Sequence, residues 1–171
     1  MPIFVSDLKF NNMKKVFITA VTAILFSVSA FAATGSTTIN TGEENVSYAV
    51  LNKFDNDFKG AKSPAWKVDA NCQKVTFILD GVSTTAFYNL TGDFLGTTQD
   101  VAYSAIPAAD QKEIAAKYQG YTVSTVIKYQ NDGANQDVDP LTYFVDLKKD
   151  ASEILLRVTP GESVHFFKTV K

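Results

Sequence analysis

The sequence predicts an α+β fold of two tandem repeats, each a helix followed by a four-stranded antiparallel meander. The phrases "NDFKGAKS" and "AKYQGYTVS" each place an aromatic residue two positions before a glycine at the end of a helix-like segment. These glycines, Gly60 and Gly120, lie 60 positions apart. Runs of alternating apolar and polar residues follow each phrase, and turn sequences separate the runs. Similar segments at a fixed spacing indicate an internal repeat.

Residues 1–32 are expected to be an export signal rather than part of the fold. From Met13 the chain reads "MKKVFITAVTAILFSVSAFAATG", with two lysines, an apolar run and an Ala30-Phe31-Ala32 cleavage pattern. A membrane anchor is the alternative, but the apolar run is shorter than the roughly 20 residues that span a bilayer. Residues 1–12 do not fit the pattern; the expected explanation is a start assigned too early, with Met13 as the true start, and an extended n-region is the alternative. We expect cleavage near Ala33, no membrane span afterwards, and a periplasmic or secreted protein.

The first repeat is predicted over residues 43–100, after a small, polar leader at 33–42. Its helix is expected over 43–60, where apolar side chains four apart form one stripe: Val46, Val50, Phe54 and Phe58. Gly60 is the expected C′ residue, because glycine adopts the left-handed conformation without a Cβ penalty. Four strands follow, joined by a turn around Cys72, an Asp80-Gly81 hairpin and a Thr91-Gly92-Asp93 turn.

The second repeat is predicted over residues 101–171. Its helix is expected over 105–120 with Pro107 in the first turn, where proline is tolerated. Asp110 follows "IP", where an aliphatic residue is expected. The strands lie in "YTVSTVIKYQ", "LTYFVDLKK", "ASEILLRV" and "SVHFFKTV". A single undivided sheet, or side chains converging in a reactive pocket, would argue against this interpretation.

The order of these motifs resembles the secreted bacterial proteins called PepSY-like or β-lactamase-inhibitor-like, which carry a tandem PepSY-type repeat. The resemblance rests on the aromatic-x-Gly helix ends, the Asp-Gly turn, "AFYNLTGDFL" and "IPAADQKEIAAKYQGYTV", and covers about residues 43–171. It implies a module that binds or inhibits proteins, notably peptidases, outside the cytoplasm. The β-lactamase inhibitor protein covers an enzyme's active site with a similar repeated fold. No catalytic residues come with this family.

No enzyme, cofactor or metal site is predicted from the residues. The chain has one histidine, His165, and one cysteine, Cys72, which cannot make a Cys/His zinc site alone. They are expected in different repeats, so a nucleophile pair is not expected. Cys72 is expected to face solvent; it has no partner for an internal disulfide, and an intermolecular one is the alternative.

Charge and loop composition argue against two further classes of site. The net charge is −2, Arg157 is the one arginine, and no basic cluster is present, so nucleic acid is not an expected partner. The acidic loop at 131–140 carries Asp132, Asp137 and Asp139 but lacks the glutamate that closes an EF-hand loop. A solvated connection is expected there, with a weak cation site as the alternative.

Alternation divides each strand between two faces of the sheet. One face is expected to pack on the helices, through Val75, Phe77, Leu79, Ile127, Tyr143, Val145, Ile154, Leu156 and Val158. The other should be polar, yet it mixes threonines with the candidate binding residues Ile78, Phe87, Phe144, Leu155, Arg157, His165 and Phe167. Aromatic residues around an arginine are typical of binding hot spots. This face is therefore predicted to bind an unknown extracytoplasmic protein. The alternatives are a face covered within the chain, a homodimer, and a carrier of a small apolar ligand between the repeats.

Overall fold

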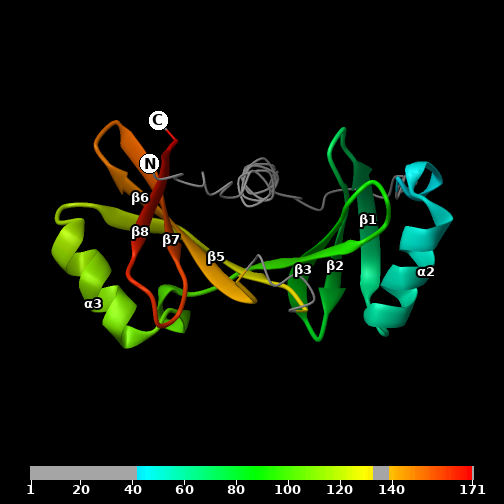
Figure 1. The fold of residues 1–171 in the computed structure, drawn as a ribbon, viewed down its shortest axis with the longest axis horizontal. Helices are drawn as coiled ribbons and strands as arrows, with labels where there is room; N and C mark the ends of the chain where they lie inside the picture. The colour runs from blue at the N-terminus through cyan, green and yellow to red at the C-terminus, as the bar shows by residue number, and fades with distance from the viewer. Residues whose placement is uncertain (1–41, 133–138, 171) are drawn as a thin grey trace, which may run out of the picture. The chain divides into compact units, whose positions relative to one another are not determined.

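The structure is a computed structural model that describes residues 42–132 and 139–170 (Figure 1). The expected export signal, most of the leader and residues 133–138 of the acidic loop, with Asp137, lie outside these ranges. The elements in chain order are η1 (Glu43–Asn45), α2 (Tyr48–Asp57), β1 (Lys62–Val68), β2 (Gln73–Leu79), β3 (Val82–Tyr88), β4 (Phe94–Asp100), η2 (Tyr103–Ala105), α3 (Ala108–Lys117), β5 (Thr122–Gln130), β6 (Leu141–Lys149), β7 (Ser152–Val158) and β8 (His165–Thr169). Neither helix in these ranges has the length and apolar character needed to cross a bilayer.

All eight strands belong to one antiparallel sheet, in the order β1 to β8. Strands β4 and β5 pair with each other, with Thr98 opposite Tyr129 and Asp100 opposite Ile127. The α+β class is therefore as predicted, but the expected separate meanders are joined into one continuous sheet. The physical reason is that β4 would otherwise present a row of unpaired backbone groups at its outer edge.

Helix α2 packs on the sheet through the apolar stripe that the sequence predicts. Ser47 caps it, with its hydroxyl accepting a hydrogen bond from the Val50 amide at 3.4 Å. Val50 and Phe54 are its buried residues. The Phe54 ring meets Trp66 of β1 and Phe77 of β2 edge-on, with centroids 5.2 and 5.0 Å away. These contacts form the core of the first half, which also includes Val75, Ala86 and Tyr88.

Helix α3 packs on strands β5–β7 in the same way, with one difference. Its buried residues are Ile114 and Asp110, so an acidic side chain stands in the inward stripe. The other buried residues of this core are apolar apart from Tyr143, and those on strands are Val126, Tyr143, Val145, Leu147, Ile154, Leu156 and Val158. Each half of the chain thus has its own helix-side core.

The repeated phrase marks the same turn twice. Helix α2 ends at Asp57 and α3 at Lys117, so Gly60 and Gly120 lie beyond the expected C′ position. Each glycine is the third residue of a turn, closed by the Ala61 amide to the Phe58 carbonyl at 3.0 Å in the first half and by a matching 3.2 Å bond in the second. Their φ angles of +88° and +80° explain the glycines, because the third position of such a turn requires positive φ.

Candidate functional site

The two helices leave one face of the sheet to the strands alone, and we call it the helix-free face. The core residues of each strand point toward the helices, and their neighbours along each strand point the other way. Cross-strand pairing fixes the same assignment, since paired residues share a face. All seven candidate residues lie on the helix-free face: Ile78, Phe87, Phe144, Leu155, Arg157, His165 and Phe167.

Three apolar residues of the second half form a compact group on this face, which we call the aromatic cluster: Phe144, Leu155 and Phe167. The rings of Phe144 and Phe167 meet edge-on, with centroids 5.2 Å apart and planes at 65°. Phe144 and Leu155 are buried, and Phe167 is half-buried. None of the three belongs to the helix-side core. The sheet therefore carries a second apolar group on its opposite face.

Two basic side chains border the aromatic cluster. Arg157 of β7 stands between Phe144 of β6 and His165 of β8 as their cross-strand neighbour. Arg157 is half-buried and His165 is exposed. An arginine between an aromatic residue and a histidine can offer planar hydrogen-bond donors while its stem packs on the rings.

The other two predicted residues lie on different strands. Phe87 of β3 is buried, opposite Lys74 on β2 and Gly96 on β4. Ile78 is 44% exposed near the β2–β3 turn. The structure thus brings five of the seven candidates together and leaves Phe87 and Ile78 apart, because β4 and β5 separate β3 from β6.

One face assignment from the sequence is wrong. Ile127 was expected on the helix side, but it pairs with Phe144 and lies on the helix-free face, while Val126 enters the helix-side core. Both residues are apolar, and the strand carries a register irregularity between Val123 and Thr125. Alternation could not decide between the two neighbours.

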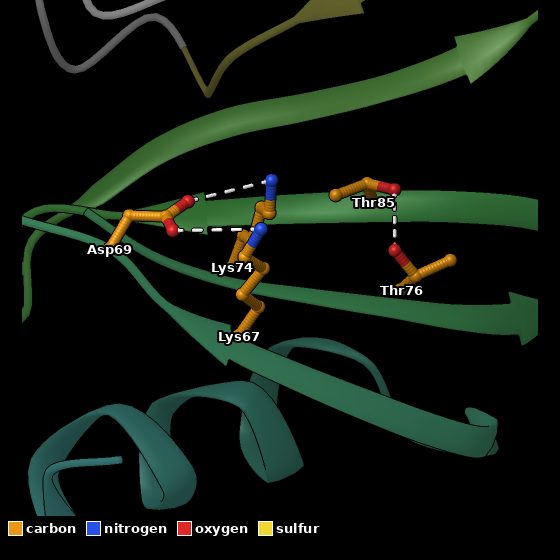
Figure 2. A network of polar contacts seen from close by, with 5 residues as sticks. All are labelled: Lys67, Asp69, Lys74, Thr76 and Thr85. Carbon is orange, nitrogen blue, oxygen red and sulfur yellow. Dashed lines mark hydrogen bonds and ion pairs between the residues drawn. The ribbon is translucent and has the colours of Figure 1, made fainter. Parts of the chain in front are cut away.

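A row of hydroxyl groups crosses the helix-free face and was not singled out by sequence reasoning. Paired positions from β2 to β6 carry Thr76, Thr85, Thr98, Tyr129 and Thr142. The hydroxyls of Thr76 and Thr85 lie 2.9 Å apart (Figure 2). The signal existed as threonines in four separate strand runs, but aligning them required the strand register.

The first half of this face carries an ion-pair group rather than an aromatic cluster. Asp69 lies between two lysines, with carboxylate oxygens 3.8 Å from the Lys67 ammonium and 3.6 Å from that of Lys74 (Figure 2). The Lys74 side chain is only 11% exposed, whereas those of Asp69 and Lys67 are 41% and 61% exposed. A buried ammonium needs a nearby opposite charge. The Asp69 carboxylate supplies that charge for Lys74, which is a structural role.

Folding also brings two carboxyl groups together on the helix-free face. Asp146 of β6 and Glu153 of β7 lie 3.8 and 3.5 Å from the Lys148 ammonium, with side chains 16% and 14% exposed. Burial raises the pKa of Asp146, and the nearby Glu153 raises it further. Sequence reasoning missed this pair, although the Lys149-Asp150-Ala151-Ser152 turn places both residues near the same hairpin end.

The position of the one cysteine differs from the sequence prediction. Cys72 is buried rather than solvent-facing. Burial raises the pKa of its thiol, and the Asp69 charge adds to the effect, so the unreactive thiol form is favoured. It lies next to β2, whereas His165 lies on β8 at the edge of the sheet. Within the described ranges, no three histidine, cysteine or acidic side chains are grouped so as to hold a metal ion.

Comparisons with known proteins identify the fold. No family model matches the chain, and no curated protein matches it in sequence. A BLIP-like protein from Bacteroides fragilis aligns with a TM-score of 0.61 and 16% identity, over 72% of this chain and 86% of that one. A DUF2874 family protein from Bacteroides uniformis aligns with a TM-score of 0.64 and 17% identity, over 73% and 90%.

A third solved structure agrees with the first two. It is a protein from Bacteroides eggerthii whose proposed location is the periplasm, with a TM-score of 0.63 and 17% identity over 73% of this chain and 89% of that one. At 16% to 17% sequence identity, these structural similarities establish a shared fold. They confirm the β-lactamase-inhibitor-like, or BLIP-like, fold that the sequence resemblance implies.

Proposed function

We propose that this chain is a non-catalytic binding module that recognises another protein outside the cytoplasm through the helix-free face. The observation that carries the proposal is the aromatic cluster, which lies outside the helix-side core and next to Arg157 and His165. Apolar side chains beside an arginine suit the centre of a protein interface. Phe144 and Leu155 supply a packed base, while Phe167, Arg157 and His165 are the groups that a partner can touch.

The proposed location follows from the export signal predicted in residues 1–32. A structural relative with a proposed periplasmic location agrees with it. The same location suits the resemblance to PepSY-like modules, and a secreted peptidase is the partner class that this resemblance suggests. We also propose that residues 43–100 and 101–171 are two copies of one unit that pair edge to edge through β4 and β5. The repeated order of one helix and four strands supports that view.

The decisive experiment uses two neighbouring phenylalanines on opposite faces of β8. Phe167 belongs to the aromatic cluster and contacts Phe144, whereas Phe166 pairs with the helix-side residue Leu156 and is 55% exposed. A photocrosslinking phenylalanine analogue at position 167 should give a discrete protein adduct in periplasmic extract of the native host. The same analogue at position 166 should not.

Competition links the adduct to the proposed surface. Excess wild-type protein should abolish the crosslink at position 167, and an Arg157→Ala competitor should do so only at a concentration at least tenfold higher. Equal labelling from positions 166 and 167, or equal competition by Arg157→Ala, would contradict binding through this face. If the captured protein is a peptidase, its activity on a casein substrate should fall on adding the wild-type chain.

A further inference from the structure

An acidic residue occupies a core position of α3 that the matching helix fills with valine. Helices α2 and α3 are both ten residues long, and each buries its third and seventh residues. These are Val50 and Phe54 in α2, and Asp110 and Ile114 in α3. Asp110 therefore occupies in α3 the sheet-facing position that Val50 occupies in α2.

Asp110 is poorly supported where it lies. Asp110 is only 5% exposed, and its Oδ2 atom has no hydrogen-bond partner among the described residues. A buried polar atom without a partner is costly, and an ionised one costs more. The arrangement is tolerable when the carboxyl group is neutral and unfavourable when it carries a charge.

The charged groups around Asp110 do not offset this cost. Glu113, one turn along α3, adds a like charge. The cations nearby serve Glu113 instead: its carboxylate accepts hydrogen bonds from the Lys117 ammonium and from the Val164 amide, and the charge of His165 also acts on it. The other titratable side chains packed in this core are four tyrosines, which are uncharged near neutral pH: Tyr103, Tyr118, Tyr121 and Tyr143.

The position of Asp110 at the start of α3 favours its charged form, but this effect is smaller than those of burial and Glu113. Asp110 lies in the first turn of α3, where the helix dipole favours a negative charge. Burial is nevertheless the largest influence and Glu113 the next, and together they raise the pKa of Asp110.

We propose that Asp110 makes the docking of α3 on the sheet depend on pH. With a neutral carboxyl group α3 is held firmly, and ionisation of Asp110 favours local opening that exposes the carboxylate to water. The opening also weakens the contact from Glu113 to the Val164 amide, which lies directly before β8. The strand that carries His165 and Phe167 would therefore respond to the same proton.

Hydrogen exchange of the two helices tests the proposal, with α2 as the internal reference. Amide protection of α3 relative to α2, corrected for intrinsic exchange rates, is measured from pH 4 to pH 8. In the wild type the ratio should fall as pH rises from the unfolded-state pKa of aspartate, about 4, through the raised folded-state value. Each unit between the two values should change the opening equilibrium about tenfold.

Two substitutions at position 110 separate the proton from the packing. Asp110→Val copies the matching residue of α2 and should give a ratio that is higher at neutral pH and flat with pH. Asp110→Asn keeps the shape and a polar group but cannot ionise, so its ratio should also be flat even if α3 is less protected overall. A pH dependence that survives in either variant would overturn the proposal.

The reciprocal variant Val50→Asp should transfer the effect to α2, whose protection should then fall as pH rises. This core substitution can prevent folding altogether. The comparison of the wild type with Asp110→Asn at the same pH values decides the question in that case, because both proteins keep the native packing of α2.

Discussion

The ring of Tyr129 lies directly against Gly96, across the pair of strands that joins the two halves of the sheet. A Cβ atom on Gly96 would be 2.7 Å from a ring carbon of Tyr129 and 2.8 Å from the carbonyl oxygen of Gln130. The Tyr129 hydroxyl donates a hydrogen bond to the Leu95 carbonyl on the same neighbouring strand. The junction between β4 and β5 therefore depends on a glycine that lets an aromatic ring approach the backbone.

Replacing Gly96 by alanine should destabilise the protein by about 1–3 kcal/mol, because the new methyl group has to displace the ring or the strand. Its φ of +141° adds strain for any residue with a Cβ. The free energy of unfolding in urea measures the effect. Gly81→Ala is the matched control, since Gly81 also has positive φ but no atom lies within 4 Å of the added Cβ. Equal losses in the two variants would show that the ring contact contributes nothing.

Removal of the Tyr129 hydroxyl tests the other half of this contact. Tyr129→Phe keeps the ring over Gly96 and leaves the Leu95 carbonyl without this donor, so we expect a loss of about 0.5–1.5 kcal/mol. Thermal unfolding followed by circular dichroism suffices as the measurement. An unchanged midpoint would mean that water replaces the hydroxyl without cost.

The aromatic cluster should contribute to stability as well as to binding. Phe144 is 5% exposed, so Phe144→Ala should lower the free energy of unfolding by about 3–5 kcal/mol. Phe166→Ala, at a side chain that is 55% exposed, should cost less than about 1 kcal/mol. If the two variants unfold at the same urea concentration, the helix-free face is not a packed part of the molecule. Binding tests therefore belong at Phe167 and Arg157 rather than at Phe144.

Local sequence signals predicted the elements and most of the faces. The apolar stripe around α2 and the Asp80-Gly81 turn each depend on neighbours in sequence, and the structure has both. The helix is shorter than the expected 43–60, so Val46 and Phe58 lie just outside it and still pack on the same core. Positive φ at Asp80 and Gly81 matches the turn type that such a pair favours. These features follow from local propensity and periodicity, which a single sequence displays.

The joining of the two halves could not be predicted in the same way. Thr98 and Tyr129 pair although 30 residues separate them, and no local preference specifies which strand edges meet. The grouping of Asp146 with Glu153 depends likewise on strand register. The burial of Asp110 was signalled only as an anomaly, because periodicity places a residue on a face without showing what it meets there.

The buried thiol of Cys72 should resist modification in the folded protein. Cys72 is 2% exposed, and burial raises its pKa, so both access and thiolate content are low. Labelling by a disulfide-exchange reagent at pH 8 should be slow in buffer and complete within minutes in concentrated urea. Rapid labelling without denaturant would indicate that the β1–β2 turn opens readily, and a covalent dimer through Cys72 would then become feasible.

Two aspartates should respond to pH with opposite signs. Burial and Glu153 raise the pKa of Asp146, so its contribution is most favourable below the unfolded-state value near 4 and is lost as pH rises through the folded-state value. Hydrogen bonds from Asn89 and Thr91 lower the pKa of Asp93. Its contribution is present above about pH 4 and is lost as pH falls through the folded-state value.

Urea unfolding of Asp146→Asn and Asp93→Asn between pH 3 and pH 8 tests these signs, each variant as a difference from the wild type at the same pH. The Asp146→Asn variant should gain stability relative to the wild type as pH rises, because the wild type alone then carries a second, poorly solvated carboxylate beside Glu153. The Asp93→Asn variant should lose relative stability over the same rise, because only the wild type forms the charge-assisted hydrogen bonds. Differences that stay constant with pH would show that neither carboxyl group titrates differently in the folded and unfolded chains, and parallel slopes would contradict the opposite environments of the two residues.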